Sequence, residues 1–435
     1  MRRVAIVGAG WSGLACALEL VGRGCEVELF EAAPQVGGRA RRVSVPLGDR
    51  SYLLDNGQHL LIGGYRETLR LMRRVGVDVD AALLRLPFEI RYADGVLLRA
   101  RPLPAPFDLA AAIAAANGLA WADRLQALSF VWHWRRRGWR VATDLPASAL
   151  FDGAPPAIVR RLWRPLCLAA LNAELHEASA RLLLAVLRDS LAGGSGAADL
   201  LLPRTDLSRT FAEPAANTLA ARGARLHLHA PVQLLRRYDA GWQLDSRGQR
   251  HAAEAVVLAL PPARAAQLLA TVESPALTAP IAQLQAIATA PIATVYLRYP
   301  QGTRLGHVAY ALLDDAAAGR HGQWLFDRGQ LDEANAAVLS VVISAAATAS
   351  AGGAAALADS VAAQLGADFR LPVPLASATI IEKRATIVPA PGLARPPAAL
   401  PLAGLYLAGD AAASDYPSTL EGSVRSGLAA AAAIA

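Results

Sequence analysis

The first stretch that could do chemistry is a glycine-rich turn between a short apolar run at residues 4–7 and a helix-like segment at residues 14–21; the turn consists of Gly8, Ala9, Gly10, Trp11, Ser12 and Gly13. In this setting the first glycine permits a tight turn, the second lets a pyrophosphate approach the backbone, and the third lets the helix pack close to the strand. The phosphates would lie on the helix N-terminus, where unpaired amides favour anions. Glu31 ends the next apolar run eighteen residues after the last glycine, close to the roughly 20 expected for an acid that binds a ribose hydroxyl. The sequence therefore predicts a dinucleotide site.

Two further motifs distinguish between the dinucleotides that such a turn accepts. The first follows Glu31 by a short loop and consists of Gly37, Gly38 and Arg39. The second lies near the other end of the sequence, at an expected strand end and the helix start that follows it: Gly409, Asp410, Glu421, Gly422 and Ser423. Together with the first turn, these motifs resemble the glutathione-reductase-type FAD fold, in the branch that contains flavin amine oxidases, phytoene desaturases and squalene-associated desaturases.

This resemblance implies that FAD is held non-covalently. The double glycine and Arg39 would approach the diphosphate, and Asp410 would bind the ribityl chain. The segment that contains Glu421 and Gly422 would meet the diphosphate or the flavin edge. A strand ending at Val232 would present its backbone to adenine. A long dinucleotide needs both ends of the chain to close over it, so motifs at both ends are expected.

Three other segments narrow the resemblance, namely residues 55–65, 382–386 and 415–423. Their combination looks like the hydroxysqualene dehydroxylases of bacterial hopanoid synthesis. That likeness implies a net reduction: the allylic hydroxyl of hydroxysqualene leaves as water, and reduced flavin transfers a hydride to the allylic cation to give squalene. The protein need supply only an apolar tunnel, a proton and a fixed flavin. The resemblance also places the first of the three segments, with Gly57 and Gln58, beside the isoalloxazine ring.

The residue that protonates the leaving oxygen is left open between three candidates. His59 is the first, because its segment would lie beside the flavin and histidine transfers protons near neutral pH. Asp55 and Tyr416 are the alternatives, and His59 could instead only hydrogen-bond its own loop. Lys383, the only lysine of the chain, would approach the flavin from a substrate-domain strand. It could equally be a surface lysine paired with Glu382.

Other functions of the same fold remain as alternatives. An oxidative desaturase of the carotenoid type shares the fold and the apolar substrate but transfers electrons in the opposite direction. An isoprenoid-binding escort protein without enzymatic activity is a further alternative, although such proteins lack the C-terminal flavin-binding signature. An amine oxidase is disfavoured because no polar or aromatic cage for an amine is evident. The sequence does not identify the electron donor that reduces the flavin.

The elements that must position these residues alternate between strands and helices. Strands are expected at residues 27–30, 224–229, 255–260, 294–299, 337–343 and 404–408, with helices at residues 65–75 and from about 421. Residues 242–244 are predicted to be the hairpin partner of the strand at 224–229. The expected class is α/β, a glutathione-reductase-type FAD-binding Rossmann fold with a discontinuous substrate domain of mixed sheet plus helices.

The chain would visit these two domains in turn. The FAD-binding domain would comprise residues 1–86, 201–265 and 391–435, and the substrate domain residues 87–200 and 266–390. The first substrate segment would be helical and could carry a membrane-contacting face.

Composition excludes several classes of protein. Hydrophobic residues make up 54% of the 435 residues, which fits a folded α/β protein. The net charge of +7 is spread along the chain without a nucleic-acid motif, so a bilayer surface is a better partner than nucleic acid. Cys16, Cys25 and Cys167 lack metal-ligand spacing, so no metal site is expected and a reducing cytosol is the natural compartment. No run is long and apolar enough for a transmembrane helix.

One helix-like segment suggests how an apolar substrate would arrive. Trp121, Leu125, Leu128 and Trp132 recur at helical spacing, and tryptophans and arginines follow them up to Arg140. Tryptophan and arginine together suit a bilayer interface. The competing interpretation is a core-packed helix with basic residues in its last turn. The first interpretation predicts a protein bound peripherally to the inner face of a bacterial plasma membrane.

Overall fold

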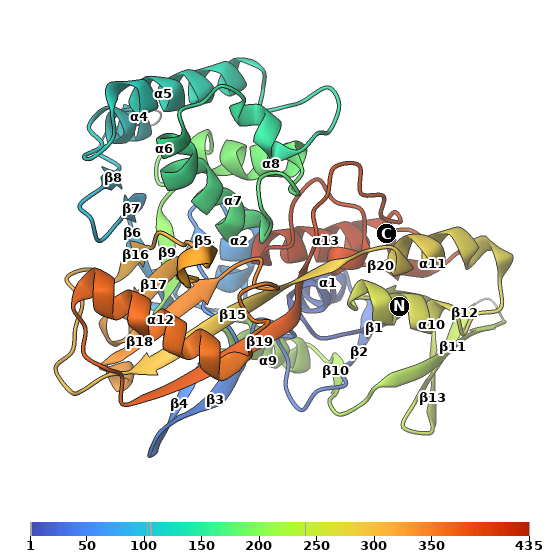
Figure 1. Ribbon diagram of the computed structural model, residues 1–435. Helices are drawn as coiled ribbons and strands as arrows, with labels where there is room; N and C mark the ends of the chain where they lie inside the picture. Colours follow the sequence, from blue (N-terminus) through green and yellow to red (C-terminus); the bar gives the residue numbers. More distant parts are fainter. Residues whose placement is uncertain (1, 102, 105–106, 240, 435) are drawn as a thin grey trace.

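A five-stranded parallel sheet forms the centre of the FAD-fold part of the molecule. The computed structural model describes residues 2–101, 103–104, 107–239 and 241–434. The strands of this sheet lie in the order β10 (Arg225–His227), β2 (Glu26–Phe30), β1 (Arg3–Val7), β14 (Ala255–Leu258) and β20 (Leu405–Leu407). All four pairings are parallel, so segments from both ends and the middle of the sequence lie side by side (Figure 1). The predicted α/β class is confirmed.

Alternating side chains of β1 fill two separate cores, because neighbouring residues of a strand point to opposite faces. Val4 and Ile6 belong to the core that contains helix α1 (Trp11–Gly22) and helix α13 (Leu420–Ile434). Ala5 and Val7 belong to a second core. That core contains the antiparallel sheet β11 (Val232–Tyr238), β12 (Gly241–Ser246) and β13 (Gln249–Ala253), and helices α10 (Pro262–Leu269) and α11 (Thr278–Gln285).

The predicted hairpin between residues 224–229 and 242–244 is wrong. β10 pairs in parallel with β2, with Leu226 opposite Leu29, while β12 pairs with β11 and β13. Residues 232–238 form the intervening strand, and positive φ at His229 turns the chain before it. The strand expected to end at Val232 therefore begins there. Alternation of apolar residues identifies a strand but not its partner, which explains the error.

A second five-stranded sheet lies beside the first (Figure 1). Its order is β16 (Ala309–Ala311), β17 (Trp324–Asp327), β18 (Val338–Ile343), β15 (Thr289–Arg298) and β19 (Ala376–Ile387), and its pairings are antiparallel. Helix α12 (Ala354–Phe369) packs Leu357, Val361 and Leu365 into its core. β15 and β18 confirm the strands expected at 294–299 and 337–343. Between Ala290 and Ile292 the register with β19 shifts, so residues 383–385 bulge out of the ladder.

The remaining elements connect or cover these sheets. The small sheets comprise β3 (Arg42–Leu47) with β4 (Arg50–Asp55), β7 (Glu89–Arg91) with β8 (Leu97–Arg99), and β5 (Leu61–Ile62), β9 (Leu200–Pro203) and β6 (Leu83–Leu86) in that order. The remaining helices are α2 (Arg66–Arg74), α3 (Val79–Ala82), α4 (Phe107–Ala114), α5 (Trp121–Arg136), α6 (Pro156–Ile158), α7 (Arg164–Leu171), α8 (Ala180–Leu191) and α9 (Glu213–Ala221). Helices α4 to α8 gather at one end of the molecule, at the top of Figure 1. The helix expected at 65–75 is confirmed as α2.

Among the described residues, no helix combines the length and the apolar character needed to cross a membrane. The two-domain division at residues 86, 200, 265 and 390 stays a proposal.

Candidate functional site

A cavity of about 610 Å³ joins the glycine-rich turn to the second sheet and the helices above it. This volume is within the roughly 300–1,000 Å³ typical of small-molecule sites. Fifteen of the predicted site residues line it: Gly8, Gly10, Trp11, Ser12, Glu31, Gly37, Gly38, Arg39, Gly57, Gln58, His59, Val232, Gly409, Asp410 and Ser423. Five do not, and they are Gly13, Asp55, Lys383, Glu421 and Gly422. Motifs from both ends of the chain thus meet at one cavity.

The glycine-rich turn forms the first wall of this cavity. At φ +105° Gly8 has a left-handed backbone, and a Cβ there would lie 2.3 Å from the Ala259 carbonyl oxygen. A Cβ on Gly13 would lie 1.9 Å from the Gly8 carbonyl oxygen, so this glycine serves helix packing without lining the cavity. Glu31 lies at the cavity, where its Oε2 accepts a hydrogen bond from the Ala9 amide at 2.9 Å.

The second glycine motif lies directly against the first. The Gly37 amide donates to the Ala9 carbonyl oxygen at 2.9 Å. A Cβ on Gly38 would lie 3.1 Å from the Gly10 Cα, so side chains are excluded where the two backbones meet. Bare backbone of this kind lets an anionic group approach the N-terminus of α1, whose N-cap residue Gly10 provides no side-chain cap.

Arg39 and Asp410 form an ion pair inside the cavity. The Arg39 Nη2 lies 2.5 Å from Asp410 Oδ2, and its Nη1 donates to the Ala385 carbonyl oxygen at 2.6 Å. Asp410 raises the pKa of Arg39. Burial raises the pKa of Asp410, but the Arg39 guanidinium outweighs burial and holds this pKa below its ordinary value. The pair therefore joins the double-glycine motif, the motif at Gly409 and the bulge of β19.

His59 lies in the cavity as a neutral ring. Its Nδ1 lies 2.6 Å from the Gly57 carbonyl oxygen, which can only accept, so Nδ1 carries the proton. Burial, together with the nearby Arg39, lowers the pKa of His59 to about 4 even though the hydrogen bond to Gly57 raises it. At neutral pH the other ring nitrogen is an acceptor, so His59 has no proton to give to a leaving oxygen. The sequence had singled out His59 as a proton donor near neutral pH, and the structure gives it a different protonation state.

The other candidate catalytic residues, two proton donors and Lys383, lie outside the cavity lining. Asp55 is buried, its Oδ1 accepts from the Leu207 amide at 2.8 Å, and burial raises its pKa to about 7. Tyr416 is buried beneath Arg425, whose guanidinium lies 4.2 Å from the ring centroid, and burial raises its pKa. Lys383 is exposed on the bulge of β19.

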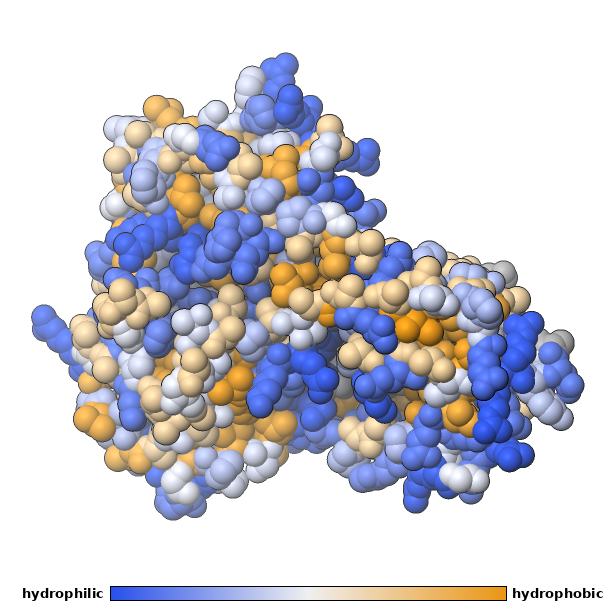
Figure 2. Space-filling model, turned by 45° about the vertical axis from the view of Figure 1, so that its right-hand side comes forward, coloured by the Kyte–Doolittle hydropathy of each residue, from blue (hydrophilic) through white to orange (hydrophobic). Residues whose placement is uncertain are grey.

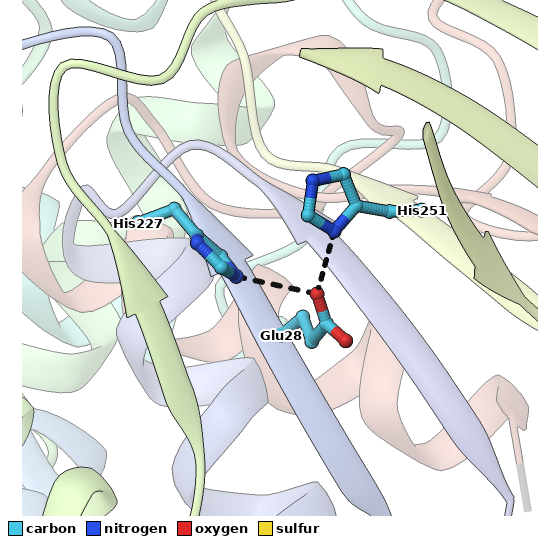
Figure 3. Close-up of side chains that lie close together, drawn as sticks. All are labelled: Glu28, His227 and His251. Carbon is cyan, nitrogen blue, oxygen red and sulfur yellow. Dashed lines mark hydrogen bonds and ion pairs between the residues drawn. The ribbon is translucent and has the colours of Figure 1, made fainter. Parts of the chain in front are cut away.

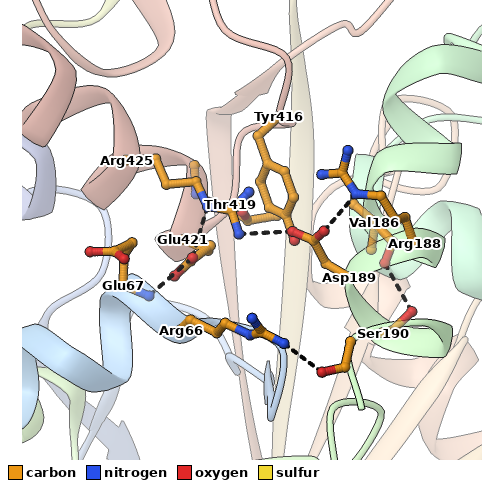
Figure 4. A network of polar contacts seen from close by, with 12 residues as sticks. Arg66, Glu67, Val186, Arg188, Asp189, Ser190, Tyr416, Thr419, Glu421 and Arg425 are labelled. Atoms are coloured by element: carbon orange, nitrogen blue, oxygen red, sulfur yellow. Dashed lines mark hydrogen bonds and ion pairs between the residues drawn. The ribbon is translucent and has the colours of Figure 1, made fainter. Parts of the chain in front are cut away.

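Glu421 caps a helix instead of lining the cavity (Figure 4). It is fully buried, and its carboxylate accepts from the amides of Glu67 and Thr68 in the first turn of α2, at 3.2 and 2.9 Å. Arg425 donates to it at 2.8 Å and also binds Asp189 of α8 at 2.8 Å. A carboxylate at a helix N-terminus satisfies unpaired amides and the helix dipole. Gly422 is needed for packing, because a Cβ there would lie 2.1 Å from the Pro417 carbonyl oxygen.

Sequence reasoning missed two groups of lining residues. Asn56 lines the cavity, and its buried Oδ1 has no hydrogen-bond partner among the described residues. The apolar wall comes from α7, α8, β17 and β18; it includes Leu166, Leu183, Val186, Leu187, Trp324 and Phe326. The position of Asn56 beside Gly57 was a usable signal, whereas the apolar wall is scattered along the chain.

The cavity fits a flavin dinucleotide by its own features. It has a bare-backbone anion cradle at one wall, a carboxylate at the end of β2, and an amide oxygen without a partner beside Gly57. The part of its lining that comes from α7, α8 and β17 is largely apolar and suits a flat, poorly hydrated ring system and an apolar substrate.

Comparisons with known proteins agree with this geometry. The sequence pattern of the family described as flavin containing amine oxidoreductase matches residues 11–435. A hydroxysqualene dehydroxylase of Rhodopseudomonas palustris is 30% identical over 99% of this chain and 97% of its own length. One of Sinorhizobium fredii is 30% identical over 63% of this chain and 65% of its own length. A probable zeta-carotene desaturase of Synechococcus elongatus is 29% identical over 53% of this chain and 50% of its own length.

Among solved structures, a cyclohexylamine oxidase of Brevibacterium oxydans is similar in fold. Its TM-score is 0.70 at 22% identity, with 100% of this chain and 98% of that chain covered. The family match and the full-length relative together establish the cofactor and the reaction class. The chain belongs to the flavin containing amine oxidoreductase family and is an FAD-dependent oxidoreductase, and a hydroxysqualene dehydroxylase is among its relatives over the full length.

Proposed function

We propose that this protein removes the hydroxyl of hydroxysqualene reductively and releases squalene. The observation that carries the proposal is the apolar wall of the cavity, which starts beside the Gly57–His59 segment and continues along α7 and α8. Because this wall is built of leucine, valine and aromatic side chains, it suits a long hydrocarbon and excludes water. The full-length relationship to a hydroxysqualene dehydroxylase supports the same substrate.

In the proposed complex, FAD lies along the wall that contains the predicted cofactor residues. The amides of the turn at Gly10 to Ser12 and the backbone of Gly37 and Gly38 would hold the diphosphate, and Glu31 would hold a ribose. Asp410 would bind the ribityl chain and Val232 would lie at adenine. Arg39 would keep Asp410 ionised as a hydrogen-bond acceptor. When bound and reduced, FAD would supply the hydride that replaces the hydroxyl, which would leave as water after taking up one proton.

His59 is proposed to position the substrate. Since its Nδ1 proton is used by the Gly57 carbonyl, its Nε2 would accept a hydrogen bond from the substrate hydroxyl. This contact would orient the carbon–oxygen bond and leave the hydroxyl oxygen free to receive its proton from another donor. Asp55 and Lys383 do not line the cavity, so any catalytic role that we propose for them is an indirect one.

The test is an anaerobic incubation of FAD-loaded protein with hydroxysqualene and a flavin reductant, followed by mass spectrometry for squalene. We expect squalene only with reduced flavin. We also expect His59→Phe to lower turnover by roughly 10- to 100-fold, the effect of losing one buried hydrogen bond. His229→Phe is the control, because that histidine is exposed and lies outside the cavity.

The competing outcome has a clear meaning as well. If yellow, reducible protein makes no squalene, the reductive function is refuted. Desaturation of a polyene by the oxidised flavin would then become the leading function, since a probable zeta-carotene desaturase is also a relative over about half of the chain.

The proposed route of the substrate is through helices α4 and α5. Trp121, Leu125 and Trp132 of α5 are 66%, 59% and 61% exposed, and Phe107 of α4 is 64% exposed. The opposite face of α5 packs into the core through Ala127, Phe130 and Trp134. The two interpretations of this segment therefore apply to different faces of one helix.

Arginines accompany the exposed tryptophans. Arg124 lies 5.1 Å from the ring centroid of Trp121, and Arg136 lies 4.5 Å from that of Trp132. Hydrophobic and hydrophilic side chains are interspersed over this end of the molecule, at the top of Figure 2. Aromatic rings with attached cations suit the headgroup region of an anionic leaflet. We propose that this surface binds the inner face of a bacterial plasma membrane peripherally.

A further inference from the structure

Three side chains with metal-ligating atoms converge beside the ring of Phe30. They are Glu28 of β2, His227 of β10 and His251 of β13 (Figure 3). Glu28 Oε2 lies 3.2 Å from His227 Nε2 and 3.1 Å from His251 Nδ1. The ligand atoms of the three residues all lie within 4.8 Å of one another. None of the three lines the cofactor cavity.

These distances match the edges of a tetrahedral metal site. Zinc lies about 2.0–2.1 Å from imidazole nitrogen and carboxylate oxygen, so neighbouring ligand atoms are about 3.3–3.4 Å apart. Both distances from Glu28 are within a few tenths of an ångström of that value. Figure 3 shows one nitrogen of each imidazole directed toward the same carboxylate oxygen. Without an ion these nitrogens donate to that oxygen, and release of their protons would present both lone pairs to a bound metal.

The surroundings hold the three ligands in place. The His227 ring stacks on Phe30 with centroids 4.8 Å apart, and the His251 ring meets the edge of Phe30 at the same distance. The second carboxylate oxygen of Glu28 accepts from Arg225 Nε at 3.1 Å. Ordered outer contacts of this kind are typical of metal ligands, because they fix the orientation of the ligating group.

Charge and exposure also suit a cation. Arg225 binds Glu26 at 2.6 Å as well as Glu28, so these three side chains have a net charge of −1. The side chains of Glu28, His227 and His251 are 19%, 33% and 18% exposed. An ion can therefore enter from solvent, and water can complete its coordination.

We propose that Glu28, His227 and His251 bind one divalent transition-metal ion, with Zn²⁺ as the representative. Two imidazoles with one carboxylate select this class over Mg²⁺ or Ca²⁺, which prefer several oxygen ligands. The ion would connect the edge of the parallel sheet to β13 of the antiparallel sheet. The sequence predicted no metal because Glu28 lies about 200 residues before His227, and the two histidines, 24 residues apart, form no spacing motif.

The proposal is tested on FAD-loaded protein without a polyhistidine tag, after treatment with a chelator. Titration with ZnCl₂ is followed by calorimetry, and titration with CoCl₂ by the visible absorption of the bound ion. We expect one equivalent to bind. Glu28→Gln, His227→Gln and His251→Gln should each weaken binding by at least about tenfold, as loss of a ligand does.

His229→Gln is the matched control, because His229 is exposed and two residues from His227 but outside the cluster. Flavin absorbance shows whether each variant remains folded. The proposal is overturned if the unmodified protein binds no Zn²⁺ stoichiometrically, or if the cluster variants bind it as tightly as the control. This readout does not depend on the proposed reaction, so the two proposals can fail separately.

Discussion

Arg39 and Asp410 are 371 positions apart in the sequence, and their contact links the double-glycine motif to the motif at Gly409. Asp410 is 6% exposed, whereas the side chain of Arg39 is 37% exposed. Removing the guanidinium leaves a buried carboxylate without its counterion, which is more costly than removing both charges. This residue pair therefore gives a direct test of how the cavity is held together.

We expect Arg39→Gln to lower the free energy of unfolding by about 2 kcal/mol, less than for a fully buried pair because Arg39 is partly solvated. Adding Asp410→Asn should restore part of that loss. Denaturant unfolding of the single and double variants, without FAD, measures the coupling. If the double variant loses as much free energy of unfolding as the two single variants together, the ion pair contributes nothing to stability.

Asp55 carries a second test at the same scale. Its pKa is raised by burial to about 7 in the folded chain. Because its pKa is raised, the folded chain holds the Asp55 proton more tightly than the unfolded chain does, and this stabilises the fold at low pH. The stabilisation is fully present below the ordinary carboxyl pKa and is lost as the pH rises through about 7. Asp55→Asn removes this titration. The variant should therefore gain stability relative to the unmodified protein, by up to about 4 kcal/mol, between pH 4 and pH 7.

The measurement is denaturant unfolding of both proteins across this pH range. A difference in stability that does not change with pH would show that Asp55 is ionised in the folded protein at all these values. Because Asn keeps an oxygen at the position of Oδ1, the hydrogen bond from Leu207 can persist in the variant.

Helix α5 is the element whose two faces differ most clearly in burial. Its buried face contributes Phe130 and Trp134 to the core, and its exposed face carries Trp121 and Trp132. A bilayer interface would stabilise the exposed rings, whereas water does not.

We expect the double variant Trp121→Ser and Trp132→Ser to lower binding to anionic lipid vesicles at least about tenfold, since each ring buries a large apolar area at an interface. Co-sedimentation with vesicles measures this. Val373→Ser with Leu375→Ser is the matched control, because these side chains are 85% and 59% exposed on the segment before β19. Equal loss in both variants would point to general surface hydrophobicity.

The same scale shows what the sequence can predict about elements. Periodicity and turn residues were sufficient for β1, α1, β2, β14 and β18, because each is a continuous apolar pattern with clear ends. Pairing was not predictable for β10, since alternation does not identify a neighbour. The bulge at residues 383–385 was equally inaccessible, and it is the bulge that leaves Lys383 exposed while Ala385 accepts from Arg39.

At the scale of the whole molecule, motif reasoning predicted the cavity lining best where glycine backbone forms the wall. Gly8, Gly37 and Gly38 were predictable because their positive φ and their close backbone neighbours disfavour any other residue. Glu421 was placed in the cofactor site by the same reasoning, yet it caps α2. A carboxylate can serve a cofactor or a helix N-terminus equally well, and only the tertiary structure distinguishes the two.

The close packing of α1 against α13 has a consequence for biosynthesis. A Cβ on Gly427 would lie 2.1 Å from the Ser12 carbonyl oxygen, so the helix of the first FAD motif is covered by one of the elements made last. Strand β20 and α13 leave the ribosome after every other described element. A nascent chain that has already folded its antiparallel sheets still lacks the Asp410 side of the cavity. FAD capture is therefore expected to follow synthesis of β20 and α13, and cells short of riboflavin would accumulate chains that contain both elements but remain open at this junction.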